Sequence, residues 1–257
     1  MKKKIYLFIW MLSIVWISGC ANDTNNVDKE KVTLSISAAS SLTVAIDEIK
    51  AMYEERNNIK LEINYASSGT LVNQMKQGAP VDVFVSASKE WMNQATEEGL
   101  IDKSSVVPLL YNRLVFGTNE KNEQISFEDM VTTEKAQIAI GDPESVPVGA
   151  YAKEVLQNKN LWDTWQSKLV YAKNARQVAV YVESGNVDAG FLFQSDAIAF
   201  KTINVIEVIP ESLHSPIVYP AGITTQTANE EGASQFLRFL QSETAQSIFK
   251  TYGFEVR

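Results

Sequence analysis

Residues 32–53 read VTLSISAASSLTVAIDEIKAMY, and this stretch decides the fold class. From Val32 to Ile36, apolar and polar residues alternate, which is the pattern of a β-strand with one buried face. From Leu42 onward, apolar residues recur at spacings of three and four, which indicates an amphipathic helix. Only the five small residues Ser37-Ala38-Ala39-Ser40-Ser41 separate the two patterns, so we expect the strand to pass directly into the helix.

The same unit recurs in the following fifty residues. Residues 59–65 alternate again, and Ser68 opens a second helical stretch that Gly78 and Pro80 end. Residues 81–85 then form a short apolar run, and a third helical pattern surrounds Trp91. This order of strand and helix predicts an α/β fold with a largely parallel sheet and helices on its faces.

A second set of elements begins near Tyr111. The patterns predict strands at residues 114–117, 137–140, 189–193 and 203–209 and helices at residues 149–157, 175–182 and 229–250. The last of these is expected to be one long amphipathic helix. A chain of 257 residues is long enough for two modest domains.

The amino terminus has the pattern of an export signal. Lys2, Lys3 and Lys4 precede an apolar run over residues 5–17, which ends in Ile17-Ser18-Gly19-Cys20. The run is shorter than the about 20 residues of a membrane-spanning helix. The tetrapeptide resembles the bacterial lipobox, which predicts a signal peptide over residues 1–19, lipidation of Cys20 and a flexible polar tether over residues 20–30. An uncleaved anchor or a chance cysteine is the alternative.

Cysteine content and charge restrict the remaining function classes. Cys20 is the only cysteine, so no disulfide can form within the chain. The chain has 23 basic and 31 acidic residues and a net charge of -8. This acidic balance disfavours nucleic acid or anionic lipid as a partner. An anionic ligand would therefore have to be held by local dipoles, because the overall field repels it.

Catalytic and metal-binding motifs are missing from the sequence. His214 is the only histidine, and with Cys20 lipidated the usual nitrogen and sulfur ligands of zinc cannot be assembled. No serine lies in a Gly-x-Ser-x-Gly motif, and no glycine-rich phosphate loop is present. We expect His214 to lie on the surface, and we expect a protein that is not an enzyme and has no metal cation or cofactor.

Hydroxyl residues follow two of the predicted strands, at Ser40-Ser41 and at Ser67-Ser68. A longer turn, Gly141-Asp142-Pro143, precedes a third helix. In a parallel α/β sheet these junctions lie at the carboxyl ends of the strands, where ligands bind. Unpaired N–H groups and the helix dipole make helix starts suitable for anions. The alternative for each serine is an ordinary helix N-cap, which pattern alone does not exclude.

At these residues the sequence resembles the extracytoplasmic molybdate-binding proteins of ABC importers. The matching segments, in chain order, are Ala38-Ala39-Ser40-Ser41-Leu42-Thr43, Ala66-Ser67-Ser68-Gly69-Thr70-Leu71, residues 78–87 (GAPVDVFVSA), Gly141-Asp142-Pro143-Glu144, residues 146–154 (VPVGAYAKE) and Tyr252-Gly253-Phe254. The resemblance implies a type II periplasmic-binding-protein fold, with two α/β domains and a ligand cleft between them. It assigns residues 31–112 with 222–257 to domain I and residues 113–221 to domain II.

The resemblance also implies a tetrahedral oxyanion held by neutral donors. Ser41 and Ser68 would bind it from the first domain, and the backbone N–H groups of Val148 and Ala175 from the second. The family usually places a tyrosine donor where this chain has Phe193. Since phenylalanine cannot donate a hydrogen bond, Ser40 or a bound water would have to take that role.

The implied function is binding of molybdate and tungstate and their delivery to an ABC-type permease. The protein would act as a lipid-anchored monomer at the outer face of the cell membrane, in a Gram-positive type of arrangement. Alternatives are the same fold binding sulfate or a small organic acid, a lipid-anchored hydrolase, or a structural lipoprotein. Arg176 is the one candidate for a carboxylate partner, although we expect it to pair on the helix surface.

Overall fold

The computed structural model describes residues 32–119 and 126–256. The strands are β1 (Val32–Ala39), β2 (Ile59–Ala66), β3 (Val83–Val85), β4 (Val107–Tyr111), β5 (Leu114–Asn119), β6 (Ile138–Gly141), β7 (Leu169–Ala172), β8 (Ala189–Phe193), β9 (Ile203–Val208) and β10 (Val218–Ile223). The helices are α2 (Thr43–Arg56), α3 (Ser68–Lys76), α4 (Lys89–Glu97), α5 (Phe127–Thr132), α6 (Pro147–Asn158), α7 (Trp162–Trp165), α8 (Ala175–Glu183), α9 (Gln194–Ala199), α10 (Glu230–Leu240) and α11 (Glu243–Thr251). Short 3-10 turns are η1 (Ser40–Leu42), η2 (Lys103–Ser105), η4 (Gln166–Lys168) and η5 (Glu211–Leu213).

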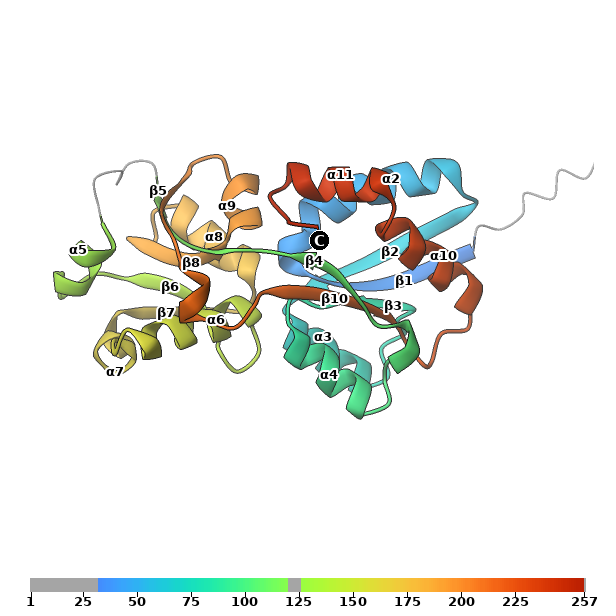
Figure 1. The fold of residues 1–257 in the computed structure, drawn as a ribbon, viewed down its shortest axis with the longest axis horizontal. Coiled ribbons are helices and arrows are strands. Elements are labelled where there is room, and N and C mark those ends of the chain that lie inside the picture. Colours follow the sequence, from blue (N-terminus) through green and yellow to red (C-terminus); the bar gives the residue numbers. More distant parts are fainter. Residues whose placement is uncertain (1–31, 120–125, 257) are drawn as a thin grey trace, which may run out of the picture. The chain divides into compact units, whose positions relative to one another are not determined.

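The first lobe consists of the sheet β2-β1-β3-β10-β4 and the helices packed on it (Figure 1). β1 pairs in parallel with β2 and β3, as the strand–helix order predicts, whereas β10 runs antiparallel to β3 and β4. Alternate side chains of β3 point to opposite faces of the sheet and pack in two different cores. Val83 and Val85 face the core that contains α2, α10 and α11, and Phe84 faces a smaller core with α3 and α4.

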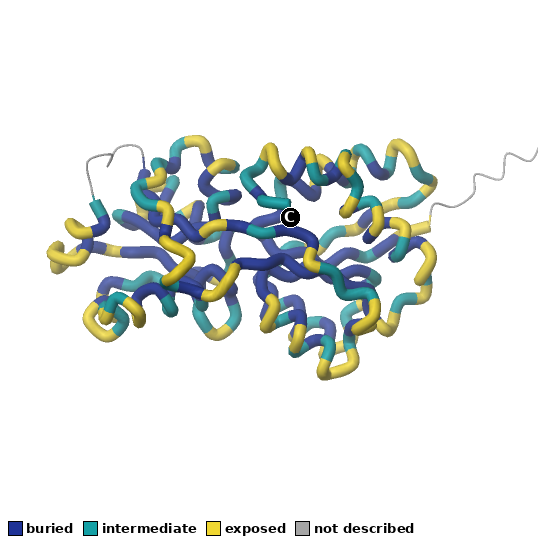
Figure 2. The backbone as a smooth tube through the Cα atoms, in the orientation of Figure 1, coloured by how far each residue is buried: buried dark blue, intermediate teal, exposed yellow. Residues whose placement is uncertain are grey.

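The second lobe consists of the sheet β7-β6-β8-β5-β9 with α5 to α9. β6 is parallel to β7 and β8, while β5 is antiparallel to β8 and β9. Its core contains an aromatic cluster in which Phe116 lies 5.0 Å from both Phe127 and Phe191, with Trp165 stacked on Phe127 at 5.3 Å. Figure 2 shows the inner strands of both sheets as mostly buried, whereas the edge strands and the outer sides of the helices are more exposed.

The chain passes between the lobes twice within the described residues. It leaves the first lobe between β4 and β5, through Asn112 and Arg113, and it returns between β9 and β10. An ion pair of 2.6 Å between Arg113 Nε and Glu255 Oε1 joins the first crossing to the carboxyl-terminal segment. The cleft expected from the sequence would lie beside these crossings, because they bring the two sheets together end to end.

One element differs from the sequence-based expectation. The single helix predicted for residues 229–250 is two helices, α10 and α11, with a break at Gln241 and Ser242. Ser242 is the N-cap of α11, and its side chain accepts a hydrogen bond from the backbone N–H of Ala245. The apolar pattern continues across the break because both helices cover the same core, so periodicity alone predicted one helix.

The amino-terminal expectations lie outside the described residues. These are the signal peptide over residues 1–19, lipidation of Cys20 and the tether over residues 20–30, all of which stay predictions. Within the ranges that the structure describes, no helix is long and apolar enough to cross a membrane. Residues 32–257 form one compact unit, and the predicted division of this unit into two domains also stays a prediction.

Candidate functional site

A small cavity lies between the lobes, at the carboxyl ends of β1 and β2. Residues of both lobes line it, and they are Ala39, Ser40, Ser41, Ala66, Ser67, Ser68, Ala87, Val146, Pro147, Ala175 and Phe193. None of these side chains is ionisable. Four of the five residues predicted to bind the ligand, Ser41, Ser68, Ala175 and Phe193, are therefore brought together around one space.

Ser41 reaches the cavity because β1 ends directly before it. The 3-10 turn η1 follows the strand without a loop, and all three residues of this turn are buried. The hydroxyl oxygen of Ser41 lies 2.8 Å from the hydroxyl oxygen of Tyr219, which is on β10. Ser41 is not an N-cap in this arrangement, since no side chain caps either η1 or α2.

Ser68 is the first residue of α3, and its neighbour Ser67 is the N-cap. The Ser67 hydroxyl accepts from the backbone N–H of Thr70 at 3.2 Å and donates to Thr70 Oγ1 at 2.8 Å. Ser68 is fully buried, and its hydroxyl oxygen accepts from the backbone N–H of Ala87 at 2.9 Å. The capping role considered for Ser68 therefore belongs to Ser67.

The start of α6 is held close to the end of β6 by two glycines. A Cβ atom on Gly149 would lie 1.9 Å from the carbonyl oxygen of Gly141, so the close approach requires glycine. Pro147 occupies the first turn and has no N–H to satisfy. Val148 is fully buried in the same turn; its neighbours Val146 and Pro147 line the cavity, whereas Val148 itself is not among the lining residues. Its predicted contribution is a backbone N–H, which a helix start leaves free.

The start of α8 reaches the cavity from the second lobe. Asn174 caps this helix by accepting from the backbone N–H of Gln177 at 2.9 Å. The backbone N–H of Arg176, in the same turn, lies 3.5 Å from Ser40 Oγ of the first lobe. Ala175 lines the cavity, and its predicted contribution to ligand binding is its backbone N–H.

Phe193 ends β8, precedes α9 and is almost fully buried. Its ring lies edge-on to Tyr151 at 6.2 Å and to Tyr219 at 5.7 Å. The Phe193 side chain lines the cavity and offers only a hydrocarbon edge to it. Sequence reasoning missed Tyr219 and its partner Asn112, because neither carries a local motif and they meet Ser41 only through the fold.

Two ionisable residues of the second lobe, Asp196 and Arg176, lie close in sequence to cavity-lining residues. Asp196, in the first turn of α9, is buried, and its Oδ2 atom has no hydrogen-bond partner among the described residues. Burial raises the pKa of Asp196 to about 7, and the charge of Arg176 opposes this rise. The Arg176 guanidinium lies over the Phe200 ring at 5.0 Å. This stacking takes the place of the surface pairing that we expected for Arg176.

His214 differs from expectation, because it is buried and not a surface residue. Its ring lies 5.9 Å from Tyr151, and its Nδ1 atom is 2.8 Å from the carbonyl oxygen of Ser215. The loop that carries it folds back over α6, which sequence alone did not indicate. Among the residues described by the structure, no cluster of histidine, cysteine and carboxylate side chains could hold a metal ion.

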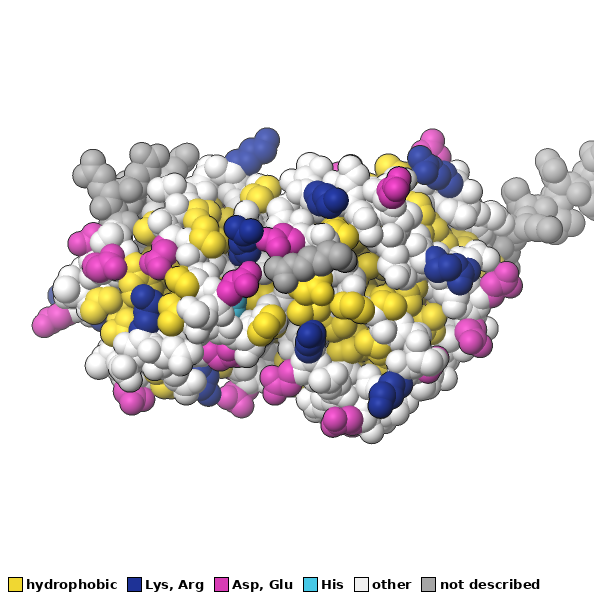
Figure 3. All heavy atoms as spheres, viewed as in Figure 1, with side chains coloured by type: hydrophobic (Ala, Val, Ile, Leu, Met, Phe, Trp, Pro, Cys, Tyr) yellow, Lys and Arg dark blue, Asp and Glu magenta, His cyan; other side chains and the backbone are white. Residues whose placement is uncertain are grey.

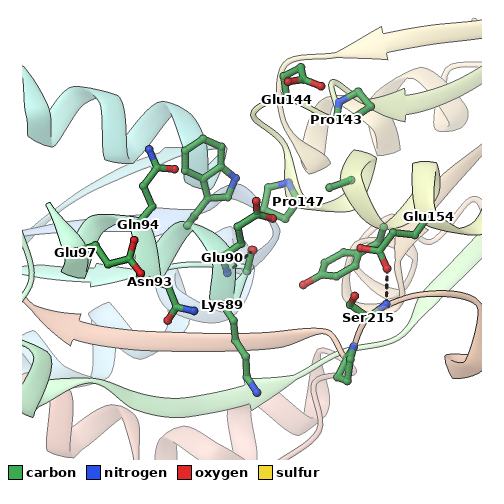
Figure 4. Close-up of a pocket in the computed structure, with 15 residues that line it drawn as sticks. Lys89, Glu90, Asn93, Gln94, Glu97, Pro143, Glu144, Pro147, Glu154 and Ser215 are labelled. Atoms are coloured by element: carbon green, nitrogen blue, oxygen red, sulfur yellow. Dashed lines mark hydrogen bonds between the residues drawn. The ribbon is translucent and has the colours of Figure 1, made fainter.

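A wide groove of about 800 Å³ lies outside the cavity and is also lined by both lobes. Figure 4 shows Lys89, Glu90, Asn93, Gln94 and Glu97 of α4 on one side and Pro143, Glu144, Pro147, Glu154 and Ser215 on the other. Four of these side chains are acidic and one is basic. On the face in Figure 3, basic and acidic side chains are interspersed, and the basic ones drawn there do not gather into a patch.

Two hydrogen bonds among the described residues connect the lobes beside the cavity. The backbone N–H of Gly69 donates to the carbonyl oxygen of Ser145 at 3.1 Å, and the backbone N–H of Arg176 lies 3.5 Å from Ser40 Oγ. The cavity is thus closed over by contacts that would have to break for a ligand to leave.

Comparison with known proteins agrees with this arrangement. The chain is 42% identical to the Bacillus subtilis protein YvgL, named as a candidate ABC transporter substrate-binding lipoprotein, over 99% of both chains. It is 35% identical to the molybdate-binding protein ModA of Escherichia coli, over 90% of this chain and 91% of that protein. A solved substrate-binding domain of a candidate molybdenum ABC transporter from Clostridium difficile is 40% identical, with a TM-score of 0.68 over 88% of this chain and 99% of that one.

The two mixed sheets joined by two crossings, together with this structural likeness, confirm the predicted α/β fold of the type II periplasmic-binding proteins. The family model described as bacterial extracellular solute-binding protein matches residues 34–255, which is almost the whole described chain. This protein therefore belongs to the bacterial extracellular solute-binding protein family.

Proposed function

We propose that this protein binds molybdate, and tungstate equally well, outside the cell membrane and delivers it to an ABC-type permease. The observation that carries the proposal is the cavity between the lobes, which has serine hydroxyls and helix starts on its wall and no charged side chain. The E. coli relative is named a molybdate-binding protein, which supports the same ligand class here.

The chemistry of the wall suits a fully deprotonated oxyanion. Each hydrogen bond to an ionised group contributes roughly 1.5–3 kcal/mol, and such a ligand has several oxygen atoms to be met. A neutral wall also avoids a cost in the empty state, because a cationic side chain there would be buried without a partner. Carboxylate ligands usually attract an arginine fork, but no arginine lines the cavity, and the Arg176 guanidinium lies over the Phe200 ring.

The proposed contacts are those of the sequence-based prediction. The hydroxyls of Ser41 and Ser68 donate from the first lobe, and the backbone N–H groups of Val148 and Ala175 donate from the second. Phe193 supplies shape without a hydrogen bond. Since the donors belong to both lobes, a bound oxyanion ties the lobes together, and we propose that the closed arrangement is the form presented to the permease. We also keep as a proposal the assignment of residues 31–112 with 222–257 to one domain and 113–221 to the other.

The proposed location is the outer face of the membrane, with a lipid on Cys20 after removal of residues 1–19. The Bacillus subtilis relative is named a lipoprotein, which supports this arrangement. The protein would act as a monomer, and no chemical step is part of its proposed task. Cys20→Ser should abolish metabolic lipid labelling and release the protein from the membrane fraction, and a variant that stays membrane-bound would contradict the anchor.

A melting-temperature screen of the purified chain tests the ligand. A ligand that binds only the folded state raises the melting temperature with its concentration. Molybdate and tungstate should both raise it strongly, whereas sulfate, phosphate and short carboxylates at equal concentration should have little effect. A larger rise in melting temperature with sulfate or a carboxylate than with molybdate would contradict molybdate as the ligand, although the chain would still be a binding protein.

A further inference from the structure

A buried chain of polar side chains runs behind Ser41 and away from the cavity. It passes from Ser41 to Tyr219, from Tyr219 to Asn112, and from Asn112 to Ser195. All four residues are buried, and Tyr219 and Asn112 do not line the cavity. Buried polar groups of this kind are costly unless each is paired. Which residue donates in each of these hydrogen bonds therefore decides which way the Ser41 hydrogen can point.

The donor in each hydrogen bond can be assigned starting from Asn112, which lies at the first crossing between the lobes. Its side-chain oxygen accepts from the backbone N–H of Arg113 at 2.8 Å. The amide NH₂ group is therefore on the other side, where it donates to Ser195 Oγ at 2.9 Å and to the hydroxyl oxygen of Tyr219 at 3.3 Å. The backbone N–H can only donate, so it fixes which way the amide is turned.

The orientation of the Asn112 amide restricts the hydrogen bonds of the Tyr219 hydroxyl. Its hydroxyl has one hydrogen, and its oxygen already accepts from Asn112. Its other short contact is Ser41 Oγ at 2.8 Å, in which either oxygen could be the donor. The assignment that leaves no hydrogen of Tyr219 unpaired has Tyr219 donating to Ser41. Burial also raises the pKa of Tyr219 well above its ordinary value, which keeps this hydrogen in place.

Ser41 then accepts from Tyr219, and its own hydrogen must point elsewhere. Ser41 lines the cavity, so the cavity is where this hydrogen can be donated. The second serine has the same polarity by a different route, because Ser68 Oγ accepts from the backbone N–H of Ala87 at 2.9 Å. Both serines are thus held from behind by donors, and both offer hydrogens, not lone pairs, to a ligand.

We propose that Tyr219, oriented by Asn112, is a positioning residue that fixes the Ser41 hydroxyl as a donor and so makes the cavity selective for fully deprotonated oxyanions. This inference rests on the proposed function. A protonated anion such as hydrogenphosphate brings a hydrogen of its own. A serine that accepts this hydrogen as well as the one from behind must turn its own hydrogen away from the ligand, where it has no acceptor. Tyr219 acts through Ser41 and does not itself contact the ligand.

The test uses the full chain in detergent and two probes, molybdate and inorganic phosphate, titrated by calorimetry at pH 8. Tyr219→Phe keeps the ring and removes only the hydroxyl. It should weaken molybdate binding by about tenfold and leave phosphate binding unchanged or tighter, because Ser41 can now turn either way. In the Ser41→Ala background the same change should weaken molybdate binding less than threefold, because Tyr219 then has no serine hydroxyl to orient. Tyr252→Phe, which removes a hydroxyl bonded to Glu48 on the surface, is the matched control and should change neither affinity.

A second variant covers the case in which Tyr219→Phe does not fold. Asn112→Asp keeps the shape but places an acceptor opposite Tyr219, so the tyrosine hydrogen turns away from Ser41 and Ser41 donates to Tyr219 instead. Molybdate binding should fall at least tenfold. In the Ser41→Ala background, Asn112→Asp should have a smaller effect if it acts through the orientation of the Ser41 hydroxyl, whereas an effect of the added charge alone would persist.

The outcomes separate the two proposals. If the parent binds molybdate but Tyr219→Phe binds it equally well, or loses as much in the Ser41→Ala background, the relay is wrong and the proposed function stands. A parallel loss for molybdate and phosphate would reduce Tyr219 to a structural residue and also overturn the relay. If the parent does not bind molybdate at all, both proposals fall together.

Discussion

The backbone N–H of Gly69 donates to the carbonyl oxygen of Ser145 at 3.1 Å, and this bond joins the first turn of α3 in the first lobe to the loop before α6 in the second. A Cβ atom on Gly69 would lie 2.6 Å from Trp91 Cζ2 and 2.7 Å from the Ser145 oxygen. The contact therefore depends on the absence of a side chain, and it lies beside Ser68 at the rim of the cavity.

Gly69→Ala should weaken molybdate binding by tenfold or more, because the methyl group keeps the lobes from closing over the ligand. Calorimetric titration measures the loss. The control is Gly185→Ala, at a residue with φ of +70° and open space around it. That change should lower the free energy of unfolding by about 1 kcal/mol through backbone strain and leave the affinity unchanged. Equal affinities in Gly69→Ala and the parent would remove the lobe contact from the account.

Ser68→Ala separates a ligand contact from a helix cap. Loss of the hydroxyl should reduce the molybdate binding free energy by about 1.5–3 kcal/mol, the contribution of a hydrogen bond to a charged group. The matched control is Ser67→Ala, which removes the N-cap of α3. It should lower the free energy of unfolding by about 1 kcal/mol and leave the affinity nearly intact, because both hydrogen bonds of Ser67 go to Thr70. The reverse pattern in the two variants would return Ser68 to a structural role.

Phe193→Tyr restores a hydroxyl at the position where the resembled family has one. The ring already lines the cavity, so the new hydroxyl should reach the ligand with little change in packing. Molybdate should bind more tightly by on the order of 1 kcal/mol if an oxyanion lone pair is otherwise unmet. An unchanged affinity would mean that a water or Ser40 already meets this lone pair. A large loss of affinity with the fold intact would contradict the placement of Phe193 beside the ligand.

Asp196 should make stability depend on pH. Its pKa of about 7 in the folded protein is above the about 3.9 of an unfolded chain, since burial disfavours the charged form. Between these values the folded protein holds a proton that the unfolded chain has released. The contribution of Asp196 to the free energy of unfolding therefore falls as pH rises, by up to about 1.4 kcal/mol per unit, and levels off above pH 7.

Asp196→Asn removes this titration and should flatten the stability profile between pH 4 and 7. Urea unfolding at several pH values, with the parent and the variant side by side, measures the difference. The variant should gain on the parent as pH rises across this window. Parallel profiles would show that Asp196 does not keep its proton in the folded protein.

The sequence predicted the fold because its information is local. The change from alternating to helical spacing at Ser40-Ser41 and at Ser67-Ser68 can be recognised from neighbouring residues alone. The structure has both strand–helix junctions where they were expected. The break between α10 and α11 was missed for the opposite reason. Apolar periodicity reports which face is buried, and both helices bury the same face. The only local signal was Ser242 as a capping residue.

The site was predictable only in part. Ser41, Ser68, Ala175 and Phe193 could be found because each lies beside a strand–helix junction or a recognisable segment. Tyr219 is 178 residues from Ser41 along the chain, and Asn112 is 107 residues from Tyr219. Their hydrogen bonds exist because β10 returns from the second lobe to lie in the first sheet. Contacts made by such a crossing have no signature in a local pattern.

The central claim is that a neutral cavity of aimed donors binds molybdate, and calorimetric titration of the unmodified chain with molybdate and sulfate tests it most directly. The donors sit on strand ends and helix starts, so the cavity is expected to fit one size of tetrahedral oxyanion closely. Molybdate should bind with one site per chain and an affinity at least a hundredfold higher than that of sulfate, a difference of about 2.7 kcal/mol. Binding of sulfate with equal or higher affinity, or no heat with molybdate, would contradict the account.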